Sequence, residues 1–339
     1  MSFKNYIHKL HQRENLAQAE IEDLMRSIMT GKVPSDDIAA FLLALRAKGP
    51  TVEEITGAAK IMRKFATRIK SRRRKILDTC GTGGDKKNTF NISTITALVV
   101  AGAGAVVAKH GNRSVSSQCG SADLLEALGV NLQIEEAHLK ECLDKIGIAF
   151  LFAQKLHPAM KNVAAVRKEL AVETIFNILG PLTNPANASH QMMGVYKADY
   201  VEPLAHVLKN LGLKKAIVVH GSDGLDEITT TAKTFISEYT GKEIISYDIT
   251  PAEVGIKEAK DNDLLGGDLA TNVRIANEIL DGGKGPKRDI VLLNAAYALY
   301  VSEKVKSIEA GLKAAKLSID KGKARGKLEA LREFTNHVR

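Results

Sequence analysis

The 339-residue sequence contains no tryptophan, only three cysteines and no hydrophobic run long enough to cross a membrane. Its longest mainly apolar run, 95–108, has 14 residues and is rich in glycine and alanine, whereas a membrane-spanning helix needs about 20. Cys80, Cys119 and Cys142 are odd in number and form no Cys-x-x-Cys pair, so we expect reduced thiols. The N-terminus also lacks an apolar signal core. These absences predict a cytoplasmic protein.

The sequence also lacks a balance of charge, because its net charge is +9. Most of this excess lies in residues 63–75, which carry eight basic side chains and no acidic one. A short basic run between helical and mixed regions is typical of a solvated connector, although it can also steer an anionic substrate. We therefore consider nucleic acid an unlikely partner. A hydrophobic content of 45% and a charged content of 26% are those of a globular protein.

Residues 1–68 predict helices only, with apolar side chains at helical spacing. The three apolar stripes are Ile21, Leu24, Met25 and Ile28; Ile38, Phe41, Leu42 and Leu45; and Ile55, Ala58, Ala59 and Met62. Thr51 and Glu54 form a capping-box pattern, and Ser35 could cap another helix. Each stripe is narrow, so this bundle must pack against the rest of the chain or against a second copy.

From residue 72 onwards, strand and helix patterns alternate. We expect strands near 74–79, 104–108, 147–153, 191–196 and 215–220, with helices near 92–102, 121–128, 135–146 and 199–211. A hairpin is predicted over 233–248, and helices dominate beyond 268. This alternation predicts an α/β fold: a mostly parallel sheet covered by helices, plus a small all-helical domain. We place the helical domain at 1–70 and the α/β domain at 71–157 and 181–339.

Two glycine-bearing loops follow predicted strands. The first is Gly81-Thr82-Gly83-Gly84-Asp85, and the second runs from Lys109 to Ser114. Backbone N–H groups in such loops, together with the start of a following helix, can bind phosphate. The Walker and Rossmann patterns are both absent. A third strand end carries Asp226-Glu227, and adjacent carboxylates on a loop suit Mg²⁺.

Longer motifs carry a specific resemblance. The segments GTGGD (81–85), NIST (91–94), KHGNRSVSSQCGSADLLEALG (109–129), TIFNILGPLTNPA (174–186) and GLDEIT (224–229) resemble the anthranilate phosphoribosyltransferase family of tryptophan biosynthesis. That family shares its fold with the pyrimidine nucleoside phosphorylases. The resemblance implies that residues 158–180 return to the helical domain and that the active site lies in the cleft between two domains. It also implies a homodimer formed through the N-terminal helices.

The reaction implied by the resemblance is Mg²⁺-dependent transfer of phosphoribose from 5-phosphoribosyl 1-pyrophosphate (PRPP) to the amine of anthranilate. The PRPP-binding residues would be Gly81, Gly84, Asp85, Thr89, Asn91, Ile92, Ser93, Thr94, Lys109, Arg113, Ser114, Ser116, Ser117 and Ser121. Anthranilate would contact Gly81, His110, Gly111, Asn112 and Arg167. The metal ligands would be Ser93, Asp226 and Glu227, and the catalytic residues Lys109, Arg167, Asp226 and Glu227.

This chemistry predicts modest demands on acid–base groups. The transition state should resemble an oxocarbenium ion, and an aromatic amine is already neutral at pH 7, so we expect His110 to position the acceptor without accepting a proton. Asn91 and Ser93 could also act as ordinary helix caps. Ala171 and Glu173 stand where the family usually has glycine and a basic residue. Glu173 could weaken the binding of an anionic acceptor.

Two alternative functions remain open from the sequence. A pyrimidine nucleoside phosphorylase would share the first glycine loop, but Lys109–Arg113 followed by Asp226-Glu227 fits a diphosphate donor and a metal better. A nucleic-acid-binding protein on the same fold would use residues 63–75 and the basic residues at 321–327. The second alternative predicts loss of the catalytic set, and that set is present.

Overall fold

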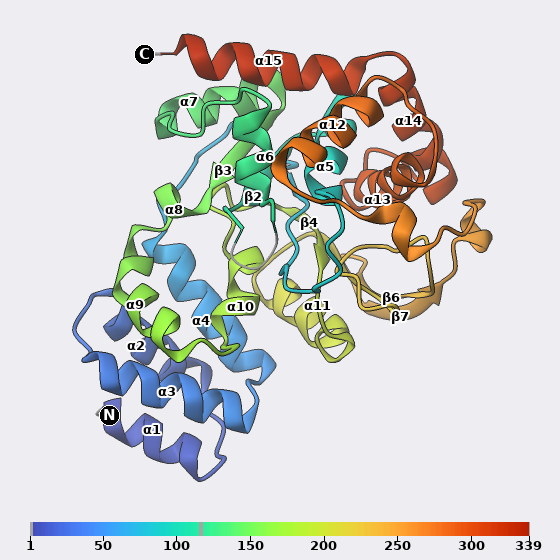
Figure 1. The fold of residues 1–339 in the computed structure, drawn as a ribbon. Helices are drawn as coiled ribbons and strands as arrows, with labels where there is room; N and C mark the ends of the chain where they lie inside the picture. The colour runs from blue at the N-terminus through green and yellow to red at the C-terminus, as the bar shows by residue number, and fades with distance from the viewer. Residues whose placement is uncertain (1–2, 115–117, 339) are drawn as a thin grey trace.

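The structure, a computed structural model, describes residues 3–114 and 118–338. Four helices form the N-terminal bundle: α1 (Phe3–His11), α2 (Gln18–Met29), α3 (Ser35–Lys48) and α4 (Val52–Phe65). Figure 1 shows this bundle at the lower end of the molecule, with the sheet and the C-terminal helices above it. Thr51 accepts a hydrogen bond from the backbone N–H of Glu54, which confirms the predicted capping box. The expected cap at Ser35 is wrong, because Pro34 occupies the N-cap position.

The bundle packs onto the rest of the same chain. Its three predicted stripes are buried, and they share one hydrophobic cluster with residues of α9 (Lys161–Leu170), α10 (Phe176–Leu179) and α11 (Val201–Asn210). Helix α9 contacts α2 and α3, while α11 contacts α4. The stripes therefore need no second copy of the chain to leave water.

Seven strands form one sheet in the order β3-β2-β1-β4-β5-β6-β7. Their bounds are β1 (Leu77–Asp78), β2 (Val107–Gly111), β3 (Ile148–Phe152), β4 (His190–Gly194), β5 (Lys215–Gly221), β6 (Thr234–Tyr239) and β7 (Ile244–Ile249). The first five are parallel, and β6 and β7 form the predicted hairpin antiparallel to β5. Strand β1 is shorter than expected, since the Ser189 hydroxyl binds the N–H of Ile76 in place of a ladder partner.

Helices cover both faces of the sheet, which is why its five parallel strands are almost entirely buried. On β5, Ile217 and Val219 join the cluster that contains α5 (Ile92–Gly102) and α13 (Pro286–Val301). Their neighbours Ala216 and Val218 join the cluster that contains α4 and α11. This alternation places two hydrophobic cores on opposite faces of one sheet and confirms the predicted α/β architecture.

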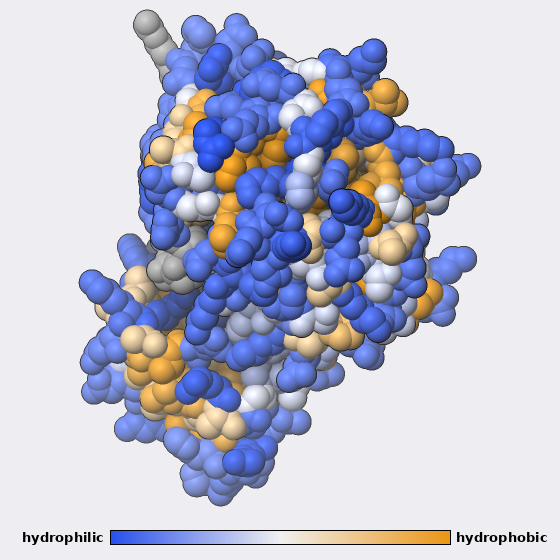
Figure 2. Space-filling view, turned by 45° about the vertical axis from the view of Figure 1, so that its right-hand side comes forward, coloured by the Kyte–Doolittle hydropathy of each residue, from blue (hydrophilic) through white to orange (hydrophobic). Residues whose placement is uncertain are grey.

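The remaining elements complete the cover. They are α6 (Ser121–Ala127), α7 (Glu136–Glu141), the π-helix η1 (Cys142–Ile146), α8 (Ala153–Leu156), α12 (Leu269–Leu280), α14 (Ile308–Asp320), α15 (Lys323–His337), and the short 3₁₀ turns η2 (Pro158–Met160), η3 (Gly180–Thr183), η4 (Ala198–Tyr200), η5 (Ala252–Val254) and η6 (Asp261–Leu264). Among the described helices, none has the length and apolarity needed to cross a membrane. The face shown in Figure 2 is largely hydrophilic, with a hydrophobic area over its lower, helical part.

Candidate active site

The three predicted loops meet at the carboxyl ends of β1, β2 and β5. The backbone N–H of Gly83 donates to Asp226 Oδ2 at 2.7 Å. Lys109 Nζ donates to Ser93 Oγ at 3.2 Å and to the Thr79 carbonyl at 3.1 Å. Because parallel strands end at the same edge of a sheet, residues more than a hundred positions apart become neighbours. The structure thus joins both glycine loops and the acidic pair in one site.

Negative charge accumulates beside the first loop. Burial and the neighbouring charge of Asp85 raise the pKa of Asp226 to about 7. Burial and Asp226 also raise the pKa of Glu227 well above its ordinary value, while Lys109 and Ser93 oppose that rise. Crowded carboxylates of this kind repel one another unless they bind protons or a cation. The donor set, carboxylate oxygens with a serine hydroxyl, fits Mg²⁺, which prefers oxygen ligands.

The acidic loop is held by residues that sequence reasoning missed. Gly194, at the end of β4, leaves no room for a side chain, since an added Cβ would lie 1.6 Å from the Asp226 carbonyl oxygen. The buried Asn294 side chain accepts from the N–H of Ile228 and donates to its carbonyl. Asp223 accepts hydrogen bonds from the hydroxyls of Thr229 and Thr231. In the sequence, the polar turn Gly221-Ser222-Asp223-Gly224 is the one pattern that indicates how this loop is held.

Lys109 lies beneath the loops and not on their surface. Lys109 is only 3% exposed, and its ammonium group donates to the Thr79 carbonyl and to Ser93 Oγ. The sequence predicted a direct phosphate contact. The structure places this positive charge beside the acidic pair and in contact with Ser93, and the phosphate contact stays a prediction.

The start of α5 differs from the expected capping pattern. Asn91 occupies the N-cap position, but its side chain makes no cap hydrogen bond. Its amide instead donates to the Cys119 carbonyl at 3.0 Å, and its backbone N–H donates to Asn272 Oδ1 at 3.1 Å. Thr89 forms an isolated bridge with Leu265. Asn91 therefore joins the first loop to the second, and Asn272 anchors both to α12.

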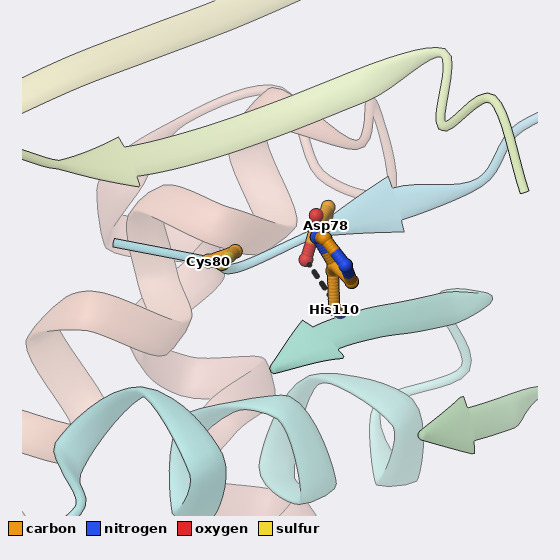
Figure 3. A group of neighbouring side chains, drawn as sticks. All are labelled: Asp78, Cys80 and His110. Atoms are coloured by element: carbon orange, nitrogen blue, oxygen red, sulfur yellow. Dashed lines mark hydrogen bonds between the residues drawn. The ribbon is translucent and has the colours of Figure 1, made fainter. Parts of the chain in front are cut away.

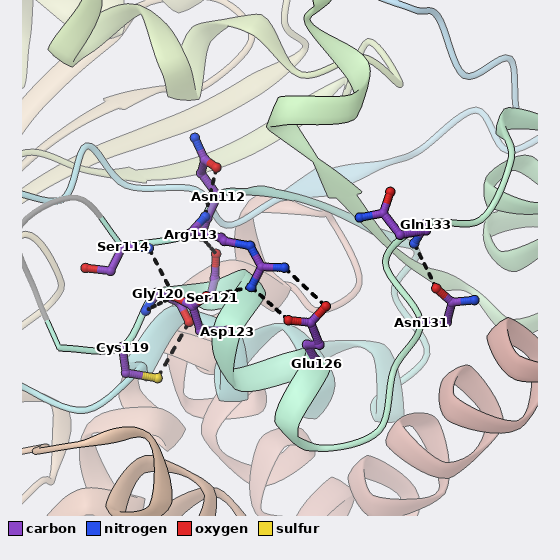
Figure 4. Close-up of polar contacts among 10 residues, drawn as sticks. All are labelled: Asn112, Arg113, Ser114, Cys119, Gly120, Ser121, Asp123, Glu126, Asn131 and Gln133. Atoms are coloured by element: carbon purple, nitrogen blue, oxygen red, sulfur yellow. Dashed lines mark hydrogen bonds and ion pairs between the residues drawn. The ribbon is translucent and has the colours of Figure 1, made fainter. Parts of the chain in front are cut away.

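The second loop is organised by carboxylates of α6 (Figure 4). Arg113 donates to Asp123 at 2.9 Å and to Glu126 at 2.8 and 3.1 Å. Asp123 also accepts from the backbone N–H groups of Ser114 and Gly120. These bonds raise the pKa of Arg113 further. The sequence predicted Arg113 as a phosphate ligand, whereas the structure pairs it with two acids that the prediction did not include.

Two other predicted residues of this loop, Ser121 and Gly111, contribute to its closure and packing. Ser121 Oγ donates to the Asn112 carbonyl at 3.2 Å, which closes the loop onto the start of α6. Gly111 is required by packing, because an added Cβ would lie 2.3 Å from Ser121 Oγ and 2.7 Å from the Phe150 ring. Ser116 and Ser117 lie outside the described residues.

His110 belongs to a buried pair. Its Nε2 lies 3.1 Å from Nε2 of His157. Burial lowers the pKa of His157 to about 4, and burial together with His157 lowers the pKa of His110 well below its ordinary value. Both rings are therefore neutral at pH 7, one donating and one accepting. This geometry agrees with a positioning role for His110.

Asp78, Cys80 and His110 form a close cluster, shown in Figure 3. Asp78 accepts from the His110 backbone N–H at 3.1 Å and from the Asn184 side chain at 2.7 Å. Burial raises the pKa of Asp78 to about 6, and burial with Asp78 raises the pKa of the Cys80 thiol. A neutral thiol beside a carboxylate already engaged by two donors is poorly prepared for a metal. We interpret the cluster as the brace between β1 and β2.

The acceptor candidate Arg167 is half-buried on α9. Its guanidinium carbon lies 5.4 Å from the centre of the Phe176 ring, and burial lowers its pKa. Nearby, Ala171 adopts a left-handed conformation with φ 49°, which explains why glycine suits this position. Glu173 pairs with Lys197 at 2.6 Å. Its charge is thus balanced within the chain.

These features define a class of protein. Residues 73–325 match the a/b domain of a glycosyl transferase family, and residues 4–66 match the helical bundle domain of that family. The fold is that of this class, in which a helical bundle accompanies an α/β domain.

Relatives narrow the class to one family. The chain is 53% identical to the anthranilate phosphoribosyltransferase of Acetivibrio thermocellus over 98% of this chain and 96% of that protein, and 50% identical to that of Petrotoga mobilis over 99% and 98%. The crystal structure of the Thermus thermophilus enzyme superposes with a TM-score of 0.93 at 41% identity, covering 98% of this chain and 99% of that one. The Saccharomyces cerevisiae enzyme in complex with PRPP and Mg gives 0.91 at 26% identity, covering 99% and 98%. The chain belongs to the anthranilate phosphoribosyltransferase family.

Proposed function

We propose that this protein transfers the phosphoribosyl group of PRPP to the amine of anthranilate, giving N-(5-phosphoribosyl)anthranilate and pyrophosphate in tryptophan biosynthesis. The observation that carries the proposal is the meeting of the Gly83 loop, Lys109 and the Asp226-Glu227 pair at one edge of the sheet. A pyrimidine nucleoside phosphorylase or a nucleic-acid-binding protein has no comparable support, because the similar sequences are anthranilate phosphoribosyltransferases over nearly their whole length.

The donor would lie across both glycine loops. Backbone N–H groups of Gly81 to Asp85 and of the first turn of α5 suit the anionic oxygens of PRPP, since the helix N-terminus carries partial positive charge. Asn91, whose amide joins the two loops, would fix their separation. Arg113 would have to exchange one of its α6 carboxylates for phosphate, so we assign it to the rim of the site.

Ser93, Asp226 and Glu227 would hold Mg²⁺, and Asp85 adds a third nearby carboxylate. When bound, the ion supplies charge neutralisation for the departing pyrophosphate. The complex of the yeast enzyme with PRPP and Mg supports the use of Mg²⁺. Lys109, held under Ser93, limits the repulsion between the acids and keeps the hydroxyl in place.

The acceptor would be gripped by Arg167, whose guanidinium can donate two parallel hydrogen bonds to the carboxylate of anthranilate. Stacking on Phe176 orients that group. The amine nitrogen would form a bond to the anomeric carbon as the carbon–oxygen bond breaks, with its electron pair leaving on pyrophosphate. The new ammonium group then loses its proton. His110 and His157, both neutral, would shape the acceptor site.

We also propose the division into a helical domain at 1–70 and an α/β domain, a cytoplasmic location, and a homodimer through the helical domain. Leu43 of α3 is 42% exposed, although the apolar stripes around it are buried within the chain. A second copy covering this side chain would remove it from water. Light scattering of Leu43→Glu against the unmodified protein tests the dimer, because a dimer through this face should dissociate. If both proteins have the mass of a dimer, the interface does not include the face around Leu43.

The central experiment follows the loss of anthranilate fluorescence in the presence of PRPP and Mg²⁺. We expect turnover that EDTA abolishes. Asp226→Asn and Glu227→Gln should each lower kcat/KM by about 100-fold or more, because electrostatic stabilisation of the leaving group is lost. Glu136→Gln is the matched control, since Glu136 is an exposed acid on α7. Unchanged rates in both site variants would show that Asp226 and Glu227 do not hold the metal. The turnover of the unmodified protein would still test the reaction itself.

A further inference from the structure

A hollow lies at the opposite end of the molecule from the helical bundle, at the other end of α5 from the active site. It has a volume of about 460 Å³ and is lined by Gly102, Lys145, Ile146, Lys323, Gly326, Lys327 and Ala330. These residues come from the end of α5, from η1 and from the first turns of α15. Figure 1 places α15 along the upper edge of the sheet domain. The volume lies within the range of small-molecule sites.

The charged residues that line this hollow are all basic. Three of its seven lining residues are lysines, and none is acidic. Lys145 pairs with Glu141 at 2.7 Å. Lys327 instead donates to the Ile146 carbonyl, and burial and the charge of Arg73 lower its pKa.

The basic connector adds to this field. Ser71 and the backbone N–H of Arg72 bind the Asp144 carboxylate of η1, and Arg73 donates to the Asp144 carbonyl. The segment singled out by its charge thus docks beside the hollow. Within the described chain, Arg73, Lys323 and Lys327 form no ion pair with a carboxylate. Cations that converge without a matching acid favour a negatively charged ligand.

The walls leave space for that ligand. Gly326 lies inside α15, where glycine is about 1 kcal/mol less favourable than alanine, yet an added Cβ would meet no atom within 4 Å. Packing therefore does not require this glycine. On the opposite wall, Gly102 allows α5 to approach α15 closely, since its Cβ would lie 2.7 Å from the Ala324 nitrogen. Ile146 and Ala330 offer apolar contact beside the lysines.

We propose that this hollow binds a small phosphorylated molecule, with its phosphate on Lys323 and Lys327 and its uncharged part against Ile146 and Ala330. The site is separate from the PRPP site. It assigns a role to basic residues of both segments, Arg73 in 63–75 and Lys323 and Lys327 in 321–327, that the transfer reaction does not use. A phosphate dianion suits such a set because charge-assisted hydrogen bonds from several cations can share its oxygens.

Calorimetric titration with inorganic pyrophosphate, in EDTA and at low ionic strength, tests the proposal. Lys323→Glu reverses a charge on the rim, and Gly326→Leu fills the hollow without altering any charge. Lys316→Glu, on an exposed position of α14 outside the hollow, is the matched control. We expect the unmodified protein and the control to bind one equivalent more than either hollow variant, with circular dichroism unchanged.

Three outcomes would overturn the proposal: equal stoichiometry in all four proteins, no saturable binding, or retention of the extra equivalent in Gly326→Leu. Transfer activity is measured in parallel, and its kcat/KM should stay within about twofold in every variant, so that failure here is distinct from failure of the proposed function. A 20-nucleotide single-stranded DNA replaces pyrophosphate in a second series. Loss of DNA binding in Lys323→Glu without loss of pyrophosphate binding would assign the basic surface to nucleic acid instead.

Discussion

Replacing Gly194 with alanine should disable the site without removing any polar side chain. Gly194 ends β4, and the backbone of Asp226 crosses directly over it. The new Cβ would lie 1.6 Å from the Asp226 carbonyl oxygen and 2.5 Å from its carbonyl carbon. Both are backbone atoms, so no change of rotamer can relieve the contact.

The size of the effect follows from these distances. To reach even the shortest contact that real Cβ atoms make, 3.0 Å, the carbonyl must retreat by at least about 1.4 Å. That movement would carry the Asp226 carboxylate away from the Gly83 N–H, now 2.7 Å distant. A misplacement of about 1 Å can lower a rate by about 100-fold. Strain from overpacking should also reduce the free energy of unfolding by about 1–3 kcal/mol.

The assay compares kcat/KM for PRPP at saturating anthranilate, together with the rise in melting temperature caused by Mg²⁺. Gly194→Ala should have a kcat/KM about 100-fold lower than the unmodified protein, and it should lose most of the Mg²⁺-induced rise in melting temperature. Gly326→Ala is the control, because it makes the same change where no atom lies within 4 Å, and it should stabilise α15. Near-normal activity and a full Mg²⁺ response in Gly194→Ala would refute the idea that β4 positions the acidic loop.

Three further predictions concern the acids, the acceptor and the strained helix end. Since the raised pKa values of Asp226 and Glu227 mean that protons compete with a cation, the Mg²⁺-induced rise in melting temperature should be larger at pH 8 than at pH 6; an equal rise would contradict this. Arg167→Ala should raise the KM for anthranilate by about 10–100-fold, and a selective rise in the KM for PRPP would count against its placement. Ala171→Gly should raise the free energy of unfolding in urea by about 0.5–1 kcal/mol by relieving φ 49°, and a lower midpoint would disprove the strain.

Much of the fold follows from local patterns. Apolar spacing located α2, α3 and α4 and, with bounds shifted by up to three residues, the five parallel strands, and Thr51 with Glu54 marked a helix start that the structure reproduces. These features depend on neighbouring residues, so a single sequence contains them. The start of β1 could not be located from the sequence, because the Ser189 hydroxyl takes the place of a backbone partner for the N–H of Ile76.

The site divides in the same way. Its glycine loops and its acidic pair were visible because each lies at or shortly after the carboxyl end of a strand, and parallel strands bring these ends together. The partners of these groups were not visible. Arg113 pairs with Asp123 and Glu126, and Lys109 lies under Ser93. Sequence motifs name the residues but do not tell which of several acids a cation contacts.

The sequence by itself determined which groups are available to this protein: two glycine loops, two adjacent carboxylates and the arginine that we propose for the acceptor. Tertiary structure alone decided how the acidic loop is held, through the contact of Gly194 with Asp226 and the clamp of Asn294 on Ile228, and where the basic connector docks, on η1. The reason is physical. Periodicity and turn chemistry act over a few residues, whereas close packing and charge balance depend on atoms that folding brings together from distant parts of the chain.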